Sequence, residues 1–259
     1  MTKGAVLLSF DVEEFDLPRE RGVEITLGDG VKVSKAGLIR ILKIIERQDI
    51  VATFFCTANF VKAEPELIRR ISESGHEIAC HGVDHFNPQA SDIEASKKKI
   101  ERVLGKKIQG YRAPRMQAID YKAMKSLGYL YDSSVNPAFI PGRYNHLNVP
   151  RRPHQKNGII EIPTSVATVM RVPLFWLALH LFPQKLYLNL CKMSLKKSGY
   201  LATYFHPWEF TDLRKYPCVP KYIQYNSGKK LEKRLEKLII NLKKAGYQFK
   251  TYASYAKID

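Results

Sequence analysis

Short apolar runs alternate along this chain with longer stretches whose apolar residues recur at helical spacing, and this alternation restricts the fold more than any other feature. Such runs predict buried strands, and the stretches between them predict amphipathic helices. Strands that alternate with helices are typical of an α/β fold with a parallel sheet. We expect strands over residues 4–10, 50–55, 77–80, 108–111, 128–131, 159–162, 200–205 and 247–251, and helices over 35–47, 64–74, 91–104, 119–127 and 229–245.

Two histidines, His81 and His85, directly follow the predicted strand at 77–80. Parallel α/β folds place their chemistry at the C-terminal edge of the sheet, so this spacing indicates a metal site there. A catalytic ion usually takes three protein ligands and keeps one position open for water, so a third ligand is needed. The alternative is that one histidine lies in the core and the other at the surface.

An acidic segment after the first predicted strand supplies candidates for the third ligand. Asp11 and Glu13 should point to the same side of an extended segment, because side chains alternate with a period of two. Neighbouring carboxylates repel one another unless a cation or a proton lies between them. The segment would otherwise be an acidic loop exposed to water.

Polar residues also follow three later strands. Arg112 could bind a carboxylate through two hydrogen bonds, or it could be an isolated surface cation. Asp132 is a further acid directly after a predicted strand. His206, with Trp208 nearby, could donate a proton or could be a core histidine with its hydrogen bonds satisfied.

The charge of the chain favours anionic partners. Its 42 Lys and Arg against 25 Asp and Glu give a formal net charge of +17. A polysaccharide, a nucleic acid or a phospholipid surface would suit this charge, although lysine-rich helix faces exposed to water also account for it. We recognise no nucleic-acid-binding motif and expect no such partner. Four scattered cysteines fit a reducing compartment, and no signal peptide is recognisable, so we expect a cytoplasmic protein.

Four segments carry more local predictions. Residues 18–34 are polar, and the alternation at 23–27 predicts a hairpin-like piece over the mouth of the sheet. Residues 91–94 predict a capping box. The basic loop at 137–157 is long enough to be functional or disordered. Residues 172–191 are the most apolar part of the chain and predict either a buried helix or an exposed, membrane-facing patch, too short to span a bilayer.

Five short motifs, each after a predicted strand, resemble the ordered motif set of the polysaccharide deacetylase family, the NodB-homology type similar to carbohydrate esterase family 4. The resemblance runs from about residue 5 to the C-terminus. It implies one catalytic domain over residues 1–259, with a distorted (β/α) barrel of fewer than eight repeats. It also implies one divalent metal ion, commonly zinc, with cobalt, nickel or manganese as alternatives. The motifs are Ser9-Phe10-Asp11-Val12-Glu13, His81-Gly82-Val83-Asp84-His85, Arg112-Ala113-Pro114, Tyr131-Asp132-Ser133-Ser134 and His206-Pro207-Trp208-Glu209.

The resemblance also implies roles for individual residues. Glu13, His81 and His85 match the metal ligands. Asp11 matches the general base, and Arg112 matches the residue that orients this base. Asp132 matches the acid that tunes the opposing histidine, and His206 matches the general acid that protonates the leaving amine. Three further residues are assigned to substrate binding: Tyr111, Arg115 and Trp208.

The chain departs from the family pattern at several positions. Many members have Asp as the ligand directly after the base, whereas this chain has Val12, so the acidic ligand is either Glu13 or Glu14. Arg115 stands where Tyr is frequent and could bind an anionic group of the substrate, or its backbone N–H could face the oxyanion. The tryptophan that often follows the Asp132 motif has no clear match.

The expected activity is metal-dependent hydrolysis of an N-acyl group, in the first place N-acetyl, on an amino sugar. The substrate would be a polysaccharide or a lipid-linked glycan precursor, with peripheral contact to the inner membrane through residues 172–191. One alternative is hydrolysis of a cyclic or other small-molecule amide on the same fold. Another is a basic barrel that binds glycan without catalysis.

Overall fold

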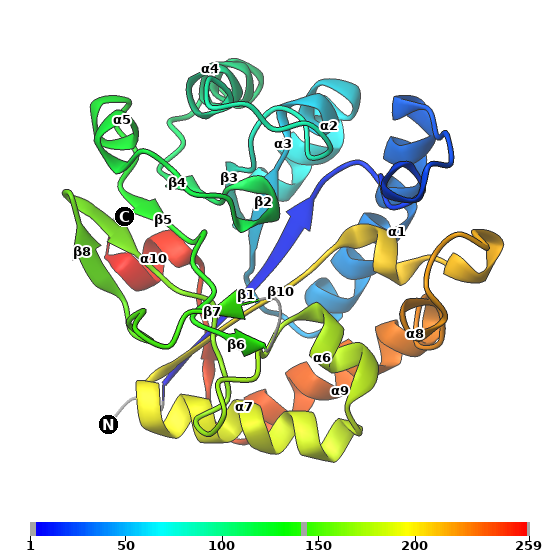
Figure 1. Ribbon diagram of the computed structural model, residues 1–259, viewed down its shortest axis with the longest axis vertical. Helices are drawn as coiled ribbons and strands as arrows, with labels where there is room; N and C mark the ends of the chain where they lie inside the picture. The colour runs from blue at the N-terminus through cyan, green and yellow to red at the C-terminus, as the bar shows by residue number, and fades with distance from the viewer. Residues whose placement is uncertain (1–3, 141–143, 258–259) are drawn as a thin grey trace.

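The computed structural model describes residues 4–140 and 144–257, and its centre is a curled, mostly parallel sheet (Figure 1). This confirms the predicted α/β fold and distorted barrel. β8 pairs with β9 in antiparallel orientation, and β11 (Gln248–Phe249) adds in parallel to the start of β1. The order of the remaining path is β10 (Tyr200–Phe205), β1 (Ala5–Val12), β2 (Thr53–Cys56), β3 (Glu77–Cys80), β4 (Gly110–Tyr111), β5 (Tyr131–Asp132), β9 (Ile159–Glu161) and β8 (His154–Lys156).

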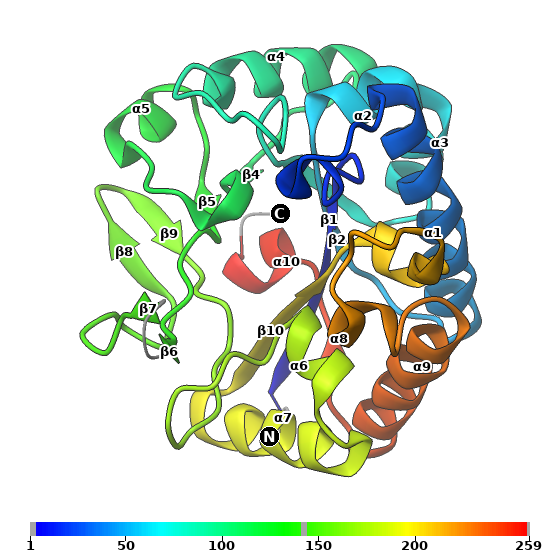
Figure 2. The same ribbon diagram turned by 45° about the vertical axis from the view of Figure 1, so that its right-hand side comes forward.

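Most of the helices lie around the outside of the curled sheet, whereas the short α10 lies within the curl (Figure 2). α9 shows why they pack there, because its apolar residues at helical spacing are all buried: Leu231, Leu235, Leu238, Ile239 and Leu242. The helices are α1 (Leu27–Arg47), α2 (Ala58–Ala63), α3 (Pro65–Glu73), α4 (Asp92–Leu104), α5 (Tyr121–Ser126), α6 (Trp176–Leu181), α7 (Gln184–Ser198), α8 (Lys221–Gln224), α9 (Lys229–Lys244) and α10 (Tyr252–Ala256).

Alternation along β1 separates two apolar layers. Val6, Leu8 and Phe10 belong to the cluster between the sheet and the outer helices. Leu7 belongs to a second cluster inside the barrel, together with Tyr252 of α10. Because side chains on a strand alternate with a period of two, the odd-numbered residues that follow Leu7 also face inward. The polar residues of this strand, Ser9 and Asp11, therefore face the barrel interior near the C-terminal edge of the sheet.

The two ends of the curled sheet meet through a few hydrogen bonds. Ser165 N donates to Ala202 O at 2.8 Å, and Ser165 Oγ accepts from Ala202 N at 2.9 Å. Tyr200 Oη donates to Pro163 O at 2.9 Å. These contacts hold the segment after β9 against β10, so the last residues of β10 lie at the same edge as those of β1.

The structure corrects two local predictions. The hairpin expected at 23–27 is wrong: Thr26 caps α1, with its Oγ1 accepting from Asp29 N at 3.1 Å, so the helix begins at Leu27. The capping box expected at 91–94 is also wrong, because Ser91 is already helical and makes no cap hydrogen bond. Instead, Asp92 Oδ2 accepts from Gln89 N at 3.0 Å.

Two segments for which the sequence allowed two interpretations, 137–157 and 172–191, contain regular structure. Within 137–157 lie β6 (Phe139–Ile140), β7 (Tyr144–Asn145) and β8, while residues 141–143 lie outside the described part of the chain. The apolar segment 172–191 forms α6 and the first half of α7, which are separated at Phe182 and Pro183. None of the helices described is both long and apolar enough to cross a membrane.

Candidate metal centre and active site

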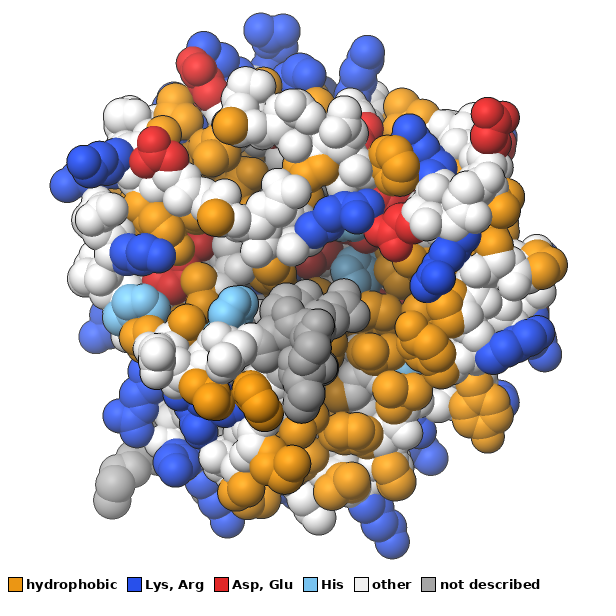
Figure 3. Space-filling view, in the orientation of Figure 1, with side chains coloured by type: hydrophobic (Ala, Val, Ile, Leu, Met, Phe, Trp, Pro, Cys, Tyr) orange, Lys and Arg blue, Asp and Glu red, His pale blue; other side chains and the backbone are white. Residues whose placement is uncertain are grey.

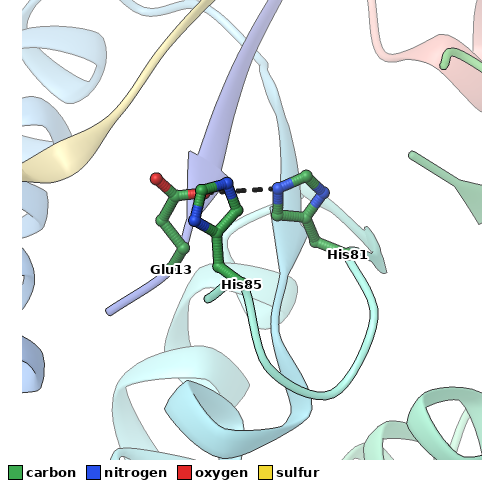
Figure 4. Close-up of side chains that lie close together, drawn as sticks. All are labelled: Glu13, His81 and His85. Atoms are coloured by element: carbon green, nitrogen blue, oxygen red, sulfur yellow. Dashed lines mark ion pairs between the residues drawn. The ribbon is translucent and has the colours of Figure 1, made fainter. Parts of the chain in front are cut away.

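Glu13, His81 and His85 meet at the C-terminal edge of the sheet and point toward one another (Figure 4). Glu13 follows β1, and both histidines follow β3. The Oε2 atom of Glu13 lies 3.3 Å from His81 Nε2 and 3.2 Å from His85 Nε2. This oxygen is buried and accepts no hydrogen bond from the described residues. A buried carboxylate is costly unless a cation, either a metal ion or a protonated imidazole, lies beside it.

The outer ring atoms of both histidines are already held by acceptors. His81 Nδ1 lies 2.8 Å from Arg112 O, and His85 Nδ1 lies 2.8 Å from Asp16 Oδ2. A carbonyl oxygen can only accept, so the proton of a neutral His81 sits on Nδ1 and its Nε2 lone pair faces Glu13. Acceptors behind metal-binding histidines are the usual means of orienting them.

The spacing of the three atoms fits one divalent ion. Two ligand atoms at about 2.1 Å from an ion in tetrahedral geometry lie about 3.4 Å apart. The observed separations of 3.2 and 3.3 Å are close to this value. The second carboxylate oxygen, Oε1, accepts from Trp208 Nε1 at 3.0 Å, which fixes the direction of Oε2. The donor set and its geometry are therefore suitable for a metal.

Electrostatic attraction between carboxylates and imidazoles stabilises the Glu13–His81–His85 cluster. Burial would lower the pKa of His85, but Glu13 and Asp16 outweigh it and raise this pKa to about 9. Burial would raise the pKa of Glu13, but His85, His206 and His81 together hold it well below its usual range. A metal ion entering the site must therefore displace protons from imidazole, and its affinity will fall with decreasing pH.

Gly82, between the two histidine positions, is required by the backbone. Its φ of +71° lies in the left-handed region, which disfavours side chains. A Cβ atom there would also stand 2.9 Å from Pro114 Cγ. The turn that brings His81 and His85 to the same oxygen therefore depends on glycine.

Asp11 and Arg112 form a buried ion pair beside the cluster. Arg112 Nη1 donates to Asp11 Oδ1 at 2.5 Å and to Ser9 Oγ at 3.0 Å. The rest of the guanidinium donates to Ser133 O and Oγ and to Tyr252 Oη, all at 3.0–3.1 Å. Arg112 is fully buried. All the N–H donors of the Arg112 guanidinium are therefore hydrogen-bonded. This network fixes the orientation of the Asp11 carboxylate.

His206 follows β10, the strand beside β1, and is held by a carboxylate that the sequence analysis did not assign. Its Nδ1 is 2.8 Å from Glu209 Oε1, and the other oxygen of Glu209 is 2.8 Å from His180 Nε2. Burial lowers the pKa of His206, but Glu13 and Glu209 outweigh this and raise it. The ring of Trp208 stacks on His206 with centroids 4.9 Å apart. Glu209 thus directs His206 Nε2 toward the pocket.

Comparison with known proteins agrees with this geometry. Residues 17–131 match the family described as polysaccharide deacetylase. Residues 17–131, less than half of the chain, therefore belong to the polysaccharide deacetylase family. Residues 133–257 match a second family, described as a domain of unknown function (DUF3473). His81, His85 and Arg112 lie in the first part, whereas His206 and Glu209 lie in the second.

Individual relatives support the same assignment. The chain is 28% identical over 121 residues to a peptidoglycan-N-acetylmuramic acid deacetylase of Bacillus subtilis, covering 43% of this chain and 45% of that protein. It is 33% identical over 82 residues to a chitooligosaccharide deacetylase of Rhizobium leguminosarum, covering 32% and 37%. The chain therefore spans less than half the length of these relatives. In fold it is similar to a putative polysaccharide deacetylase from Mycobacterium smegmatis, with a TM-score of 0.67, 19% identity and coverage of 99% and 90%.

Asp132 does not have the position in this deacetylase fold that the family resemblance implied. No hydrogen bond or ion pair of the described residues joins it to His206, whose partner is Glu209. The Asp132 carboxylate instead accepts from Ser134 Oγ at 2.6 Å and from Ser134 N at 3.0 Å. It also shares a hydrogen bond with the buried Glu161. The short side chain of Asp132 is turned back onto its own loop.

The Asp132–Glu161 pair predicts a particular dependence of stability on pH. Burial and the neighbouring Asp132 raise the pKa of Glu161 from 4.5 to about 11, so the folded pair retains a proton that the unfolded chain loses. Between these two values stability therefore falls as pH rises, by at most about 1.4 kcal/mol per pH unit. We expect Glu161→Gln to flatten this slope in urea unfolding from pH 6 to 9. The exposed Glu66→Gln is the control, and equal slopes in wild type and Glu161→Gln would contradict the prediction.

Three other predicted residues have clear positions. Glu14 turns away from the histidines and accepts from Thr57 Oγ1 at 2.8 Å, and burial raises its pKa to about 7. Arg115 lines the pocket, but its guanidinium is already paired with Glu20 at 2.8 Å, so it offers no unpaired cation to an anionic substrate.

Tyr111 was assigned to substrate binding, but it packs in the core against Tyr129 outside the pocket. Its side chain faces the outer helices because Arg112, the next residue, faces inward.

A pocket of about 460 Å³ lies over these residues and has two different sides. One side carries Asp11, the Glu13–His81–His85 cluster and His206. The other side is apolar, with residues of α6 and the loops before and after it, among them Phe175 and Trp176. Figure 3 shows histidine and acidic side chains within a hollow bordered below by hydrophobic ones. A larger hollow of about 740 Å³ at the opposite end of the sheet contains a single histidine, His76.

Proposed function

We propose that this protein is a metal-dependent hydrolase that removes an N-acetyl group from an amino sugar. The observation that carries the proposal is the convergence of Glu13 Oε2, His81 Nε2 and His85 Nε2 in a buried cluster, with Asp11 and His206 in the same pocket. The family membership supports hydrolysis, and the names of the relatives support N-acetylated glycan as the class of substrate.

Glu13, His81 and His85 would hold the ion, most suitably zinc in view of the nitrogen and oxygen donors. When bound, it would polarise the acyl oxygen and lower the pKa of an attacking water. Asp11 would accept the proton of this water, because its carboxylate lies in the pocket and is oriented by Arg112. A base must lie within hydrogen-bond reach of the proton that it takes, and the buried ion pair fixes that position.

His206, which lines the same pocket, would protonate the departing nitrogen. Glu209 accepts from its Nδ1, so the proton available for transfer is the one on Nε2. The hydrogen bond and the negative charge of Glu209 favour the protonated form of His206. Trp208 would act indirectly, because its indole N–H is bonded to Glu13 and its ring packs on His206.

The proposed substrate is an N-acetylated amino sugar in a polysaccharide or in a lipid-linked glycan precursor. The volume of the pocket, about 460 Å³, accommodates more than one sugar ring. Its apolar side, around Phe175 and Trp176, suits the apolar face of a sugar or an attached hydrocarbon group.

Metal content tests the proposal most directly. We expect about one equivalent of divalent metal per chain in protein purified without chelator, and loss of this metal in His81→Ala, because only three side chains form the site. Acetate release from N-acetylated chito-oligosaccharide and from peptidoglycan fragments should disappear with the metal. His154→Ala, which changes a histidine on β8 outside the pocket, is the control. A wild-type chain that binds no zinc or cobalt, or a His81→Ala chain with unchanged metal content, would overturn the assignment.

A further inference from the structure

The apolar side of the pocket continues outward as an exposed surface, which we call the apolar rim. It comprises Phe139, Val169, Met170, Leu181 and Leu186. Phe139 and Leu181 line the pocket itself. Phe139 N donates to Arg171 O at 3.3 Å, which places it beside the hairpin that carries Val169 and Met170. Leu181 ends α6, and Leu186 lies in the first turns of α7. The rim thus extends from the mouth of the pocket to the surface.

The hairpin at 166–173 presents its apolar tip in a fixed position. Val166 bridges Pro173 at its base. Met170 at the tip has 77% of its surface exposed, more than any other large apolar side chain described. Met170 and Arg171 have φ of +61° and +48°, which is unfavourable for residues other than glycine. Such a conformation persists when the surroundings enforce it.

Hydrogen bonds of the Arg171 side chain maintain this conformation. Its Nη1 donates to His146 O at 2.7 Å and to Val149 O at 2.9 Å, so the hairpin is tied to the neighbouring loop. The fixed tip keeps the apolar side chains of Val169 and Met170 exposed to water, which lowers solubility. Large exposed apolar surfaces next to a binding site usually contact a partner.

The charge around the rim restricts the kind of partner. Residues 162–208 contain five Lys or Arg and no Asp or Glu. On α7, Leu186 and Met193 are exposed and lie two turns apart, whereas Leu190 between them is half-buried against the core. Lysines flank them at positions 185, 192, 196 and 197. A helix face with apolar residues bordered by lysines is typical of segments that lie in the interface of an anionic membrane. Figure 3 shows the hydrophobic side chains gathered over the region of α6 and α7, with basic side chains at its border.

We propose that the apolar rim and α7 dock on the surface of an anionic phospholipid bilayer. Aliphatic and thioether side chains would enter the headgroup region, and the lysines would contact lipid phosphates. A second copy of the chain is a poorer occupant, because it would bring the same lysines into mutual contact. A nucleic acid would leave the aliphatic side chains without a suitable environment. Docking would turn the mouth of the pocket, where Phe139 and Leu181 lie, toward the membrane surface.

Vesicle co-flotation with the full chain tests this proposal. We expect the protein to float with vesicles of phosphatidylglycerol and phosphatidylcholine, to bind pure phosphatidylcholine vesicles much less, and to dissociate partly at high salt. The double variant Val169→Ser/Met170→Asn should bind about tenfold more weakly, because two apolar side chains no longer enter the interface. Asn suits the left-handed backbone at position 170, so the variant should remain folded.

A matched control and a second variant separate the two contributions. Leu130→Ser removes an apolar side chain that is 41% exposed and precedes β5, away from the pocket, and it should leave binding unchanged. Lys196→Glu/Lys197→Glu should weaken binding to anionic vesicles at low salt. Wild-type protein that does not bind anionic vesicles, or equal losses in the rim variant and Leu130→Ser, would overturn the proposal. A dimer in light scattering that the rim variant dissociates, without vesicle binding, would assign the rim to self-association instead.

The rim and the metal centre are tested independently. Metal content of the rim variant should equal that of the wild type, since none of its changes touches Glu13, His81 or His85. Failure of vesicle binding would leave the metal chemistry standing, and a metal-free wild-type chain that still floats with vesicles would leave the docking surface standing.

Discussion

Replacement of Asp11 by Asn is expected to reduce the rate of acetate release by about 10²–10⁴-fold, the usual contribution of a general base. The amide has nearly the shape of the carboxylate but does not accept a proton at neutral pH. Its oxygen can still accept from Arg112 Nη1, which now donates to Asp11 Oδ1. The measurement is kcat/KM for acetate release from N-acetylated chito-oligosaccharide, together with metal content and Tm.

Metal content decides how a loss of activity in Asp11→Asn is to be understood. We expect one equivalent of metal to remain, because Asp11 is not among the three residues whose ligand atoms converge. Asp29→Asn, the same change at an exposed residue of α1, should leave the rate unchanged and is the control. Near-normal turnover in Asp11→Asn would remove Asp11 from the role of base. Loss of metal in this variant would make it a ligand instead.

Much of the site could be predicted from the sequence because strand periodicity and strand ends are local properties. Asp11 and Glu13 were expected on one side of the chain after the first predicted strand. In the structure Asp11 lies within β1, Glu13 follows it, and both line the pocket. Residues that follow parallel strands meet at one edge regardless of the rest of the fold. The helix α9 and its buried face were likewise predictable from spacing alone.

The partner of His206 could not be identified in this way. Strand ends bring many polar residues to the same edge, but they do not determine which carboxylate reaches which histidine. Glu209 reaches His206 because His206 is the N-cap of the short 3₁₀ helix Pro207–Phe210, and a glutamate three residues further on can also accept from the backbone N–H of His206. This capping-box spacing is visible in the sequence and was the available signal. His180 had no such signal, since it arrives from α6 only through tertiary packing.

The apolar segment at 172–191 shows a different limit of sequence reasoning. Its composition was compatible with a buried helix and with an exposed patch, and the structure contains both. Pro183 separates α6 from α7, and this changes the direction of the chain so that Leu179 and Tyr187 are buried whereas Leu181 and Leu186 are exposed. Average hydrophobicity over such a segment does not determine which residues face solvent; the position of the break does.

Replacement of Arg112 by Met is expected to lower the free energy of unfolding by about 3–5 kcal/mol, the cost of leaving one partner of a buried ion pair alone. Arg112 is fully buried, pairs with Asp11 and lies over the Phe55 ring at 4.0 Å from its centroid. Urea unfolding at pH 7 measures the effect. Arg47→Met removes an exposed ion pair with Glu236 and should cost less than about 1 kcal/mol.

The double variant Asp11→Asn/Arg112→Met separates the stabilising role of this pair from its role in the reaction. With both charges removed, no ion remains unpaired in the interior, so the double variant should be about 1–3 kcal/mol more stable than the sum of the two single changes predicts. Its acetate release should nevertheless stay as low as in Asp11→Asn, because a neutral side chain at position 11 cannot act as the base. Strictly additive losses of stability would show that the two charges do not depend on one another. Recovery of activity along with stability would show that the pair serves only to hold the barrel interior together.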